Sequence, residues 1–202
     1  MTGGHSTTRE RVTADHLPDL LAEGLDVIFC GINPALSAAS AGHHFNAGSN
    51  RFWRVIHRAG FTPQEIQAEN DRMILQYGCG LTAVVARPTA RAEQLSAEEF
   101  IAAAAPFERK IRRYAPRFVA FLGKAAYAAL SHRREIAWGP QAELFGGAAA
   151  WVLPNPSGRN RAFGLDQLVN AYGDLRRAAS AQPIQRVTLP AETRRRSIGS
   201  RD

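Results

Sequence analysis

Three short, nearly continuous apolar runs constrain the fold of this chain more than any other feature of its sequence. They are LDVIFCG at residues 25–31, RFVAFLG at residues 117–123 and AAAWVLPNP at residues 148–156. A run without polar alternation suits a strand that is covered on both faces, and segments with helical periodicity lie between these runs. Together the patterns predict an α/β fold in which a central, mainly parallel sheet has helices on either side.

The segments between the runs carry helix signals of several kinds. Residues 50–59 place apolar side chains on one helical face, as expected of a helix packed on a sheet. Thr62-Pro63-Gln64-Glu65 and Ser96-Ala97-Glu98-Glu99 both have the form of a capping box, so each predicts the start of a helix. Pro106 should interrupt the second of these helices, so residues 107–114 are expected to form a separate one.

Two of the three predicted strands are followed by the same dipeptide, Asn-Pro. The first is followed by Asn33-Pro34 and the third by Asn155-Pro156, while the middle strand is followed by Gly123-Lys124. Asn-Pro is a common turn, so either copy alone predicts no more than a loop. Ligands of parallel sheets bind outside the carboxyl ends of the strands. We therefore expect two neighbouring strands to bring Asn33 and Asn155 to one cavity, with Lys124 at the same edge.

Length and composition fit one globular domain. The chain has 202 residues, 45% of them hydrophobic, which suffices for one well-buried core. We expect residues 1–19 to be a flexible N-terminal extension, residues 20–179 to form the domain and residues 180–202 to be a basic, disordered tail. The sequence has neither a membrane-spanning apolar run nor a signal-peptide pattern, so a cytoplasmic location is expected, associated with the nucleoid if the protein is bacterial.

The formal net charge of +7 comes almost entirely from arginine. A basic surface favours polyanions, of which nucleic acid is the commonest, although arginine-rich composition can also reflect a bias of the source genome. The tail contributes +3 of this total and is a candidate nonspecific tether for phosphates. The rest of the chain remains positive without it.

Several familiar motifs are absent from the sequence. Gly123-Lys124 lacks the upstream glycine and the following hydroxyl residue of a phosphate-binding loop, and no dinucleotide-binding fingerprint or hydrolase nucleophile elbow follows a predicted strand. Two cysteines are too few for a four-cysteine zinc or iron–sulfur site. No nearby carboxylate completes a metal site around His43, His44 or His57. We therefore expect neither a metal nor an organic cofactor.

Four blocks of the sequence are distinctive in combination. They are GINPALSAASAGHHFNAGSNRFWRVIHRAGFT, LTAVVARPT, FLGKAAY and WVLPNPSGRNR. These blocks resemble the mismatch-specific uracil-DNA and thymine-DNA glycosylase family, and the similarity extends from about Leu25 to Arg177. The resemblance implies a three-layer α/β/α sandwich. It also implies an enzyme that removes uracil, thymine or related damaged pyrimidines mispaired with guanine.

The resemblance assigns roles to residues near both Asn-Pro turns. Asn33 matches the family's water-positioning residue, and Phe45 matches the aromatic residue that stacks on the flipped base. Gly31 and Ile32 fall in the base pocket, where backbone amides near Ile32 and Asn33 would donate to a carbonyl of the base. Asn155 matches a polar group that fixes the base or its local loop. Without the resemblance, Phe45 would be expected as a core anchor and Asn155 as a turn-stabilising side chain.

Ser157-Gly158-Arg159-Asn160-Arg161 resembles the family's wedge, which enters the duplex where the base has left and contacts the opposite guanine. Arg159 stands where an apolar, leucine-like residue is common, so this wedge is expected to act as an electrostatic clamp as well as a plug. Lys124 is expected to contact phosphate. Ala35 and Ala38 also depart from the family pattern and leave the finer base preference open.

The sequence thus predicts a monofunctional DNA glycosylase that acts as a monomer on double-stranded DNA. An amide such as that of Asn33 can orient water but cannot accept a proton at neutral pH. Glu93, in the loop before the helix that Ser96 begins, is therefore a candidate base or charge stabiliser, although a solvated loop glutamate is the simpler interpretation. The alternatives are a non-catalytic protein that binds damaged DNA on the same fold, and a hydrolase of free nucleotides.

Overall fold

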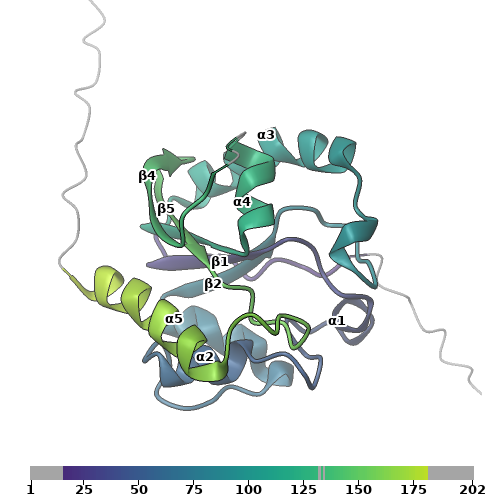
Figure 1. Cartoon of the computed structure of the whole chain (residues 1–202). Helices are drawn as coiled ribbons and strands as arrows, with labels where there is room; N and C mark the ends of the chain where they lie inside the picture. Colours follow the sequence, from purple (N-terminus) through teal and green to yellow (C-terminus); the bar gives the residue numbers. More distant parts are fainter. Residues whose placement is uncertain (1–15, 132, 134, 182–202) are drawn as a thin grey trace, which may run out of the picture.

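A computed structural model describes residues 16–181 of the chain, except residues 132 and 134. Most of the expected N-terminal extension and nearly all of the expected tail therefore lie outside the described residues, although Leu17 is described and is buried. The elements form three layers, with a sheet between two layers of helices (Figure 1). This is the α/β/α arrangement that the sequence predicts. None of the described helices combines the length and the apolar character needed to cross a membrane.

The central sheet has the strand order β2-β1-β3-β5-β4. Four strands are parallel, and β4 pairs antiparallel with β5 at one edge. The bounds are β1 (Val27–Gly31), β2 (Cys79–Ala83), β3 (Phe118–Leu122), β4 (Gly139–Phe145) and β5 (Ala148–Leu153). The three strands predicted from the apolar runs are confirmed as β1, β3 and β5, whereas the sequence patterns do not predict β2 and β4.

The strand order corrects one expectation about the site. The strands β1 and β5, which lead to Asn33 and Asn155, are not neighbours, because β3 lies between them. Since all three strands are parallel, their carboxyl ends still lie at the same edge of the sheet. The two Asn-Pro turns are therefore separated by the width of one strand, and the end of β3 lies between them.

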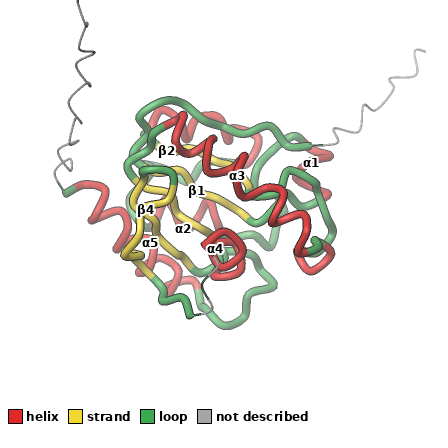
Figure 2. The backbone as a smooth tube through the Cα atoms, turned by 90° about the horizontal axis from the view of Figure 1, so that it is seen from above, coloured by secondary structure: helices red, strands yellow, loops and turns green. Residues whose placement is uncertain are grey.

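Helices cover both faces of the sheet, as the view from above shows (Figure 2). One layer contains α3 (Ala97–Tyr114) and α4 (Lys124–Ser131). The other contains α2 (Phe52–Arg58), the 3-10 helix η1 (Ala68–Tyr77) and α5 (Leu165–Ser180). The short helices α1 (Leu36–Ala41) and η2 (Ala92–Gln94) lie in the connections that follow β1 and β2.

The pleat of the strands divides the core into two clusters. Val27 and Phe29 of β1 point into the cluster with α2, η1 and α5, whereas Ile28 and Cys30 point into the cluster with α3 and α4. This alternation explains why the runs are apolar throughout, since both faces of each strand are buried. Each large apolar side chain buried in this way contributes about 1.5–3 kcal/mol relative to exposure, so the strand ends are firmly placed.

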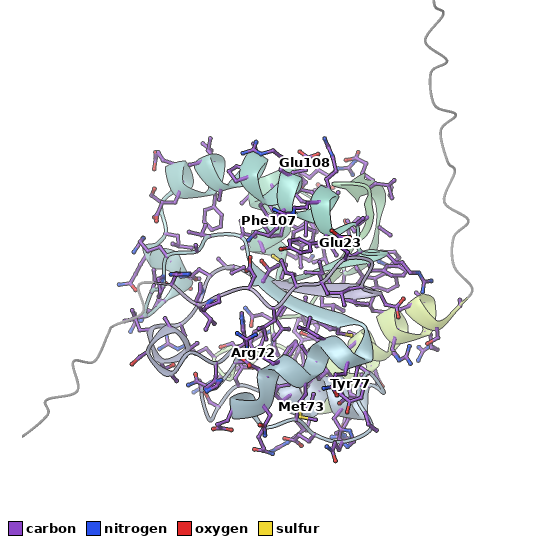
Figure 3. All side chains as sticks on the ribbon, turned by 180° about the vertical axis from the view of Figure 1, so that it is seen from behind. Glu23, Arg72, Met73, Tyr77, Phe107 and Glu108 are labelled. Atoms are coloured by element: carbon purple, nitrogen blue, oxygen red, sulfur yellow. The ribbon has the colours of Figure 1, made fainter. Side chains whose placement is uncertain are left out.

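The prediction that Pro106 separates two helices is wrong. α3 runs unbroken from Ala97 to Tyr114 with Pro106 inside it. Pro106 is exposed, while Phe107 points from the helix toward the sheet (Figure 3) and is buried together with Ile111. Packing of this apolar face offsets the hydrogen bond that proline cannot donate.

Only one of the two predicted capping boxes begins a helix. Ser96 begins α3 as expected, because its side chain accepts from the backbone nitrogen of Glu99 and the Glu99 carboxylate accepts from the nitrogen of Ser96. The box at Thr62 does not begin a helix. The Thr62 hydroxyl instead donates to the carbonyl oxygen of Gln64 at 2.8 Å, and the next helix, η1, begins only at Ala68.

Candidate active site

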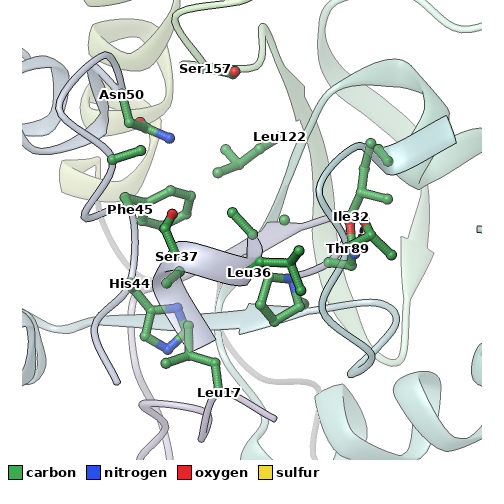
Figure 4. A pocket seen from close by; sticks show the side chains of 18 of the residues that line it. Leu17, Ile32, Leu36, Ser37, His44, Phe45, Asn50, Thr89, Leu122 and Ser157 are labelled. Carbon is green, nitrogen blue, oxygen red and sulfur yellow. Dashed lines mark hydrogen bonds between the residues drawn. The ribbon is translucent and has the colours of Figure 1, made fainter. Parts of the chain in front are cut away.

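A cavity of about 950 Å³ opens at the carboxyl ends of the parallel strands, where ligands of such sheets bind. Its walls come from the loops after β1, β2 and β5 and from the segment before α2, and a close view shows Phe45, Thr89 and Ser157 around it (Figure 4). Asn33 and Asn155 both line this cavity. The structure thus brings the two Asn-Pro turns to one hollow rather than to opposite faces of the molecule.

The side-chain amide of Asn33 is held in one orientation. Its Nδ2 donates to the carbonyl oxygen of Arg87 at 2.9 Å and to Oγ1 of Thr89 at 2.7 Å. The Thr89 hydroxyl donates its own hydrogen to the carbonyl oxygen of Arg91 at 2.7 Å, so it can only accept from Asn33. Because both N–H groups of the amide are used, Oδ1 is the atom that can accept a hydrogen bond from a water or ligand in the cavity.

Backbone hydrogen bonds join the loop after β2 to the loop after β1 and fix the surroundings of Asn33. Gly31 and Ile32 also line the cavity. Their carbonyl oxygens accept from the backbone nitrogens of Val84 and Val85, at 3.0 Å each. The backbone nitrogen of Thr89 donates to the carbonyl oxygen of Pro34 at 3.1 Å. The loop that orients Asn33 is therefore an extension of the sheet, which limits its motion.

Arg87 connects the same loop to α3. Its guanidinium donates to both carboxylate oxygens of Glu99, at 2.6 and 2.8 Å. The hydrogen bonds from Arg87, followed by the one from the backbone nitrogen of Ser96, lower the pKa of the Glu99 carboxyl to about 2. The carbonyl oxygen of Arg87 that accepts from Asn33 is thus tied to the beginning of a long helix.

Phe45 forms an aromatic wall of the cavity. Its backbone has a φ of 54°, a left-handed conformation that costs a residue with a side chain about 1–3 kcal/mol. The ring stacks on the buried ring of Phe52 in α2, with centroids 4.0 Å apart and planes inclined by 23°. The half-buried ring also borders the cavity, so it offers a planar surface to a planar ligand.

His44 anchors the strained conformation of its neighbour Phe45. The backbone nitrogen of His44 donates to the Asp71 carboxylate at 2.9 Å, and its carbonyl oxygen accepts from Nε1 of Trp53 at 3.1 Å. Burial lowers the pKa of the His44 imidazole, so the ring is neutral at neutral pH. The Nε2 atom lies 2.9 Å from the carbonyl oxygen of Pro18, which places the hydrogen of the neutral ring on Nε2.

The loop after β5 has its own hydrogen-bonded turn. Oδ1 of Asn155 accepts from the backbone nitrogen of Ser157, and the carbonyl oxygen of Asn155 accepts from Nδ2 of Asn160, both at 2.9 Å. The side-chain oxygen therefore stabilises the turn, while the residue also lines the cavity. A Cβ atom on Gly158 would lie 2.5 Å from the carbonyl oxygen of Ser49, so only glycine allows this contact with the segment before α2.

Of four further candidate residues from the sequence, two line the cavity and two are not part of its described lining. Glu93 is exposed in η2 and lines it, as does the exposed Arg159. Among the described residues, Lys124 and Arg161 are not part of its lining. Lys124 begins α4, and its Nζ lies 4.8 Å from the centre of the Trp138 ring. Arg161 is exposed in the loop after β5.

The sequence analysis assigns no role to some residues that act at this site. Thr89 and Arg87 orient Asn33, and although both lie in the block LTAVVARPT, nothing in that block indicates a contact with Asn33. A second polar cluster lines the cavity away from the Asn-Pro turns: Nζ of Lys110 lies 2.6 Å from the carboxylate of Asp19, which also accepts from Thr82 at 2.7 Å. In the part of the chain that the structure describes, no three His, Cys, Asp or Glu side chains are grouped to hold a metal ion.

Comparison with known families identifies a superfamily whose model matches most of this chain. The profile of the uracil DNA glycosylase superfamily matches residues 18–176. The chain belongs to this superfamily. The matched range contains the residues that orient Asn33 and Phe45. The superfamily assignment also confirms the coarser part of the resemblance seen in the sequence blocks.

A solved structure supports the same fold. It is a solution NMR structure of a candidate uracil DNA glycosylase from Methanosarcina acetivorans, which superposes on this chain with a TM-score of 0.59 at 20% sequence identity. The superposition covers 81% of this chain and 97% of the archaeal protein. At this level of identity the similarity shows a common uracil DNA glycosylase-like fold and no more.

Proposed function

We propose that this chain is a DNA glycosylase that hydrolyses the bond between a mispaired uracil and its deoxyribose and leaves an abasic site. The observation that supports this most directly is the fixed amide of Asn33 in a cavity bordered by the ring of Phe45. A flipped pyrimidine would stack on Phe45, and Oδ1 of Asn33 would orient a water toward the sugar carbon that loses the base. Membership of the superfamily favours the same class of reaction.

The proposed reaction needs charge stabilisation at two places. Cleavage builds positive charge on the sugar and negative charge on the departing base, whose carbonyl would accept from backbone amides near Ile32 and Asn33. The attacking water must also lose a proton, which an amide cannot accept. Of the two carboxylate residues that line the described cavity, Asp19 is paired with Lys110. Glu93 is therefore the proposed base or charge stabiliser.

The proposed partner is double-stranded DNA that contains a mispaired or damaged pyrimidine. Flipping a base out of the duplex costs less when it is mispaired, which would favour uracil opposite guanine and leave thymine and other damaged pyrimidines as further candidate substrates. The loop from Ser157 to Arg161 would occupy the emptied stack, while Lys124 would contact phosphate. In this proposal residues 20–179 act as one monomeric domain and residues 180–202 as a basic tether.

Release of free uracil from a duplex with a single G·U pair tests this proposal. The full chain is expected to release uracil under single-turnover conditions, and Asn33→Ala should lower the rate constant by about a hundredfold or more, because the water is no longer oriented. The same duplex with a G·C pair provides the blank. Free deoxyuridine tests for a nucleotide hydrolase. A wild-type chain that releases no uracil from the G·U duplex would overturn the proposal, whether or not it hydrolyses free deoxyuridine.

A non-catalytic protein that binds damaged DNA is the second candidate, because Asn33 cannot accept a proton and Glu93 is exposed. Such a protein would bind the G·U duplex more tightly than the G·C duplex and release no base from either. Glu93→Gln examines the proposed base separately. A variant with the wild-type single-turnover rate would remove Glu93 from the mechanism and leave the role of Asn33 intact.

A further inference from the structure

The guanidinium of Arg51, the residue before α2, is bound entirely to the loop that follows β5. Its Nε donates to the carbonyl oxygen of Pro156 at 3.2 Å and its Nη1 to that of Phe163 at 2.7 Å. Its Nη2 donates to the carbonyl oxygens of Ser157 and Asn160, both at 2.9 Å. The backbone nitrogen of Arg51 adds a bond to Pro156 at 3.1 Å. One side chain thus gathers four carbonyl groups of one loop.

These bonds replace the regular backbone pairing that the loop lacks. Between the end of β5 and the start of α5 the chain has no helix or strand, so its carbonyl groups need other donors. The hydroxyl of Tyr172 supplies one to Pro154 at 3.2 Å, and Nδ2 of Asn160 supplies one to Asn155. Arg51 supplies donors to four more carbonyl groups of this loop. A planar guanidinium presents its N–H groups in a fixed fork, whereas a lysine ammonium is a single point on a flexible stem.

Arg51 also connects two walls of the cavity, the aromatic wall of Phe45 and the loop after β5. The following residue, Phe52, carries the ring on which Phe45 stacks. Ser49, two residues before Arg51, contacts Gly158 so closely that a Cβ atom on Gly158 would collide with it. The loop after β5 is therefore fixed against the same segment that fixes the aromatic wall. Arg51 itself is not among the described residues that line the cavity.

We propose that Arg51 is a positioning residue that holds the loop after β5 in the shape that enters the duplex, in register with the stacking ring of Phe45. This inference rests on the proposed glycosylase function. Arg51 does not reach the base or the sugar. It acts by ordering the loop before DNA is bound, so that less of the binding free energy is lost to ordering during base extrusion.

The experiment measures base extrusion separately from base release. A duplex with a 2-aminopurine beside a hydrolysis-resistant 2′-fluoro-deoxyuridine opposite guanine reports extrusion by fluorescence, and the cleavable G·U duplex reports single-turnover release. Arg51→Lys keeps the charge and loses the fork, so both rate constants are expected to fall by the same factor, roughly tenfold or more. A purely structural role would lower the amplitudes, that is, the fraction of active protein, and leave both rate constants unchanged.

Two further variants complete the test. Arg58→Lys is the matched control, because Arg58 is an exposed residue at the other end of α2 that pairs with Asp166, and it should keep both wild-type rate constants. Gly158→Ala leaves the fork of Arg51 in place and forces the loop away from Ser49, so it should also slow extrusion. If Arg51→Lys does not fold, as judged by circular dichroism, this variant tests whether the position of the loop limits extrusion.

The outcomes separate this inference from the proposed function. Wild-type extrusion by folded Arg51→Lys, or by Gly158→Ala where Arg51→Lys does not fold, overturns the positioning role even if uracil is released normally. A wild-type chain that extrudes the base without releasing it contradicts the glycosylase function, and a loss of extrusion in Arg51→Lys would still support the positioning role. A wild-type chain that neither extrudes nor releases the base overturns both.

Discussion

Among single side chains, Thr89 sets the direction of the Asn33 amide, because its hydroxyl hydrogen is committed to Arg91 and its oxygen can only accept. Thr89→Val keeps the shape of the side chain and removes this acceptor. One N–H group of the amide then has no partner, and only the carbonyl oxygen of Arg87 still holds its orientation. Losing one such hydrogen bond is worth about 1–1.5 kcal/mol, and the single-turnover rate of uracil release should fall about tenfold. Affinity for the G·U duplex should change little.

Thr89→Ser provides the control for this change, because it keeps the hydroxyl and removes only a methyl group. Its single-turnover rate should stay close to that of the wild type. If Thr89→Val released uracil as fast as Thr89→Ser, the orientation of the Asn33 amide would not limit the reaction, and water would have to be placed by another group.

At the level of helices and loops, Glu99 joins the start of α3 to the loop that orients Asn33. Its folded pKa of about 2 lies below the ordinary value of 4.5. The interaction therefore stabilises the fold above about pH 4.5 and is lost as the pH falls toward 2. Glu99→Gln should flatten the pH dependence of the free energy of unfolding across this window, as measured by urea denaturation. Arg87→Met should flatten it as well, and an unchanged slope in both variants would contradict this assignment.

The unbroken course of α3 leads to a prediction about Pro106. Proline inside a helix costs about 3 kcal/mol relative to alanine, and about 1 kcal/mol of this is returned because proline restricts the unfolded chain. Since Pro106 is exposed, Pro106→Ala should raise the free energy of unfolding by about 2 kcal/mol, measured by urea denaturation at neutral pH. A lower stability would show that proline at this position is needed for packing on the sheet.

The elements also show what the sequence can and cannot predict. Ser96 is predicted correctly because a capping box is completed within four residues. The box at Thr62 fails because its hydroxyl donates to the carbonyl oxygen of Gln64 instead of accepting from a backbone N–H. β4 is missed because its residues are largely exposed and lack an apolar run. Asn33 and Asn155 stand out as residues at strand ends. The bonds of Thr89 and Arg51 connect residues 56 and 105–112 positions apart, and no local pattern contains them.

At the scale of the whole molecule, residues 182–202, which lie outside the described residues, hold a large share of the positive charge. They carry five arginines against one glutamate and one aspartate, a balance of +3 within the total of +7. Each phosphate neutralised by a protein contributes about −0.9 to the slope of log K against log salt. Removal of these residues should therefore make the slope for duplex binding shallower by up to about 3, as measured by fluorescence anisotropy over a series of sodium chloride concentrations. Because the described lining of the cavity runs from His16 to Asn160, we expect the preference for G·U over G·C and the single-turnover rate at saturating protein to stay unchanged. A truncated chain that releases uracil more slowly at saturation would show that the tail takes part in the site and does more than hold the protein near phosphates.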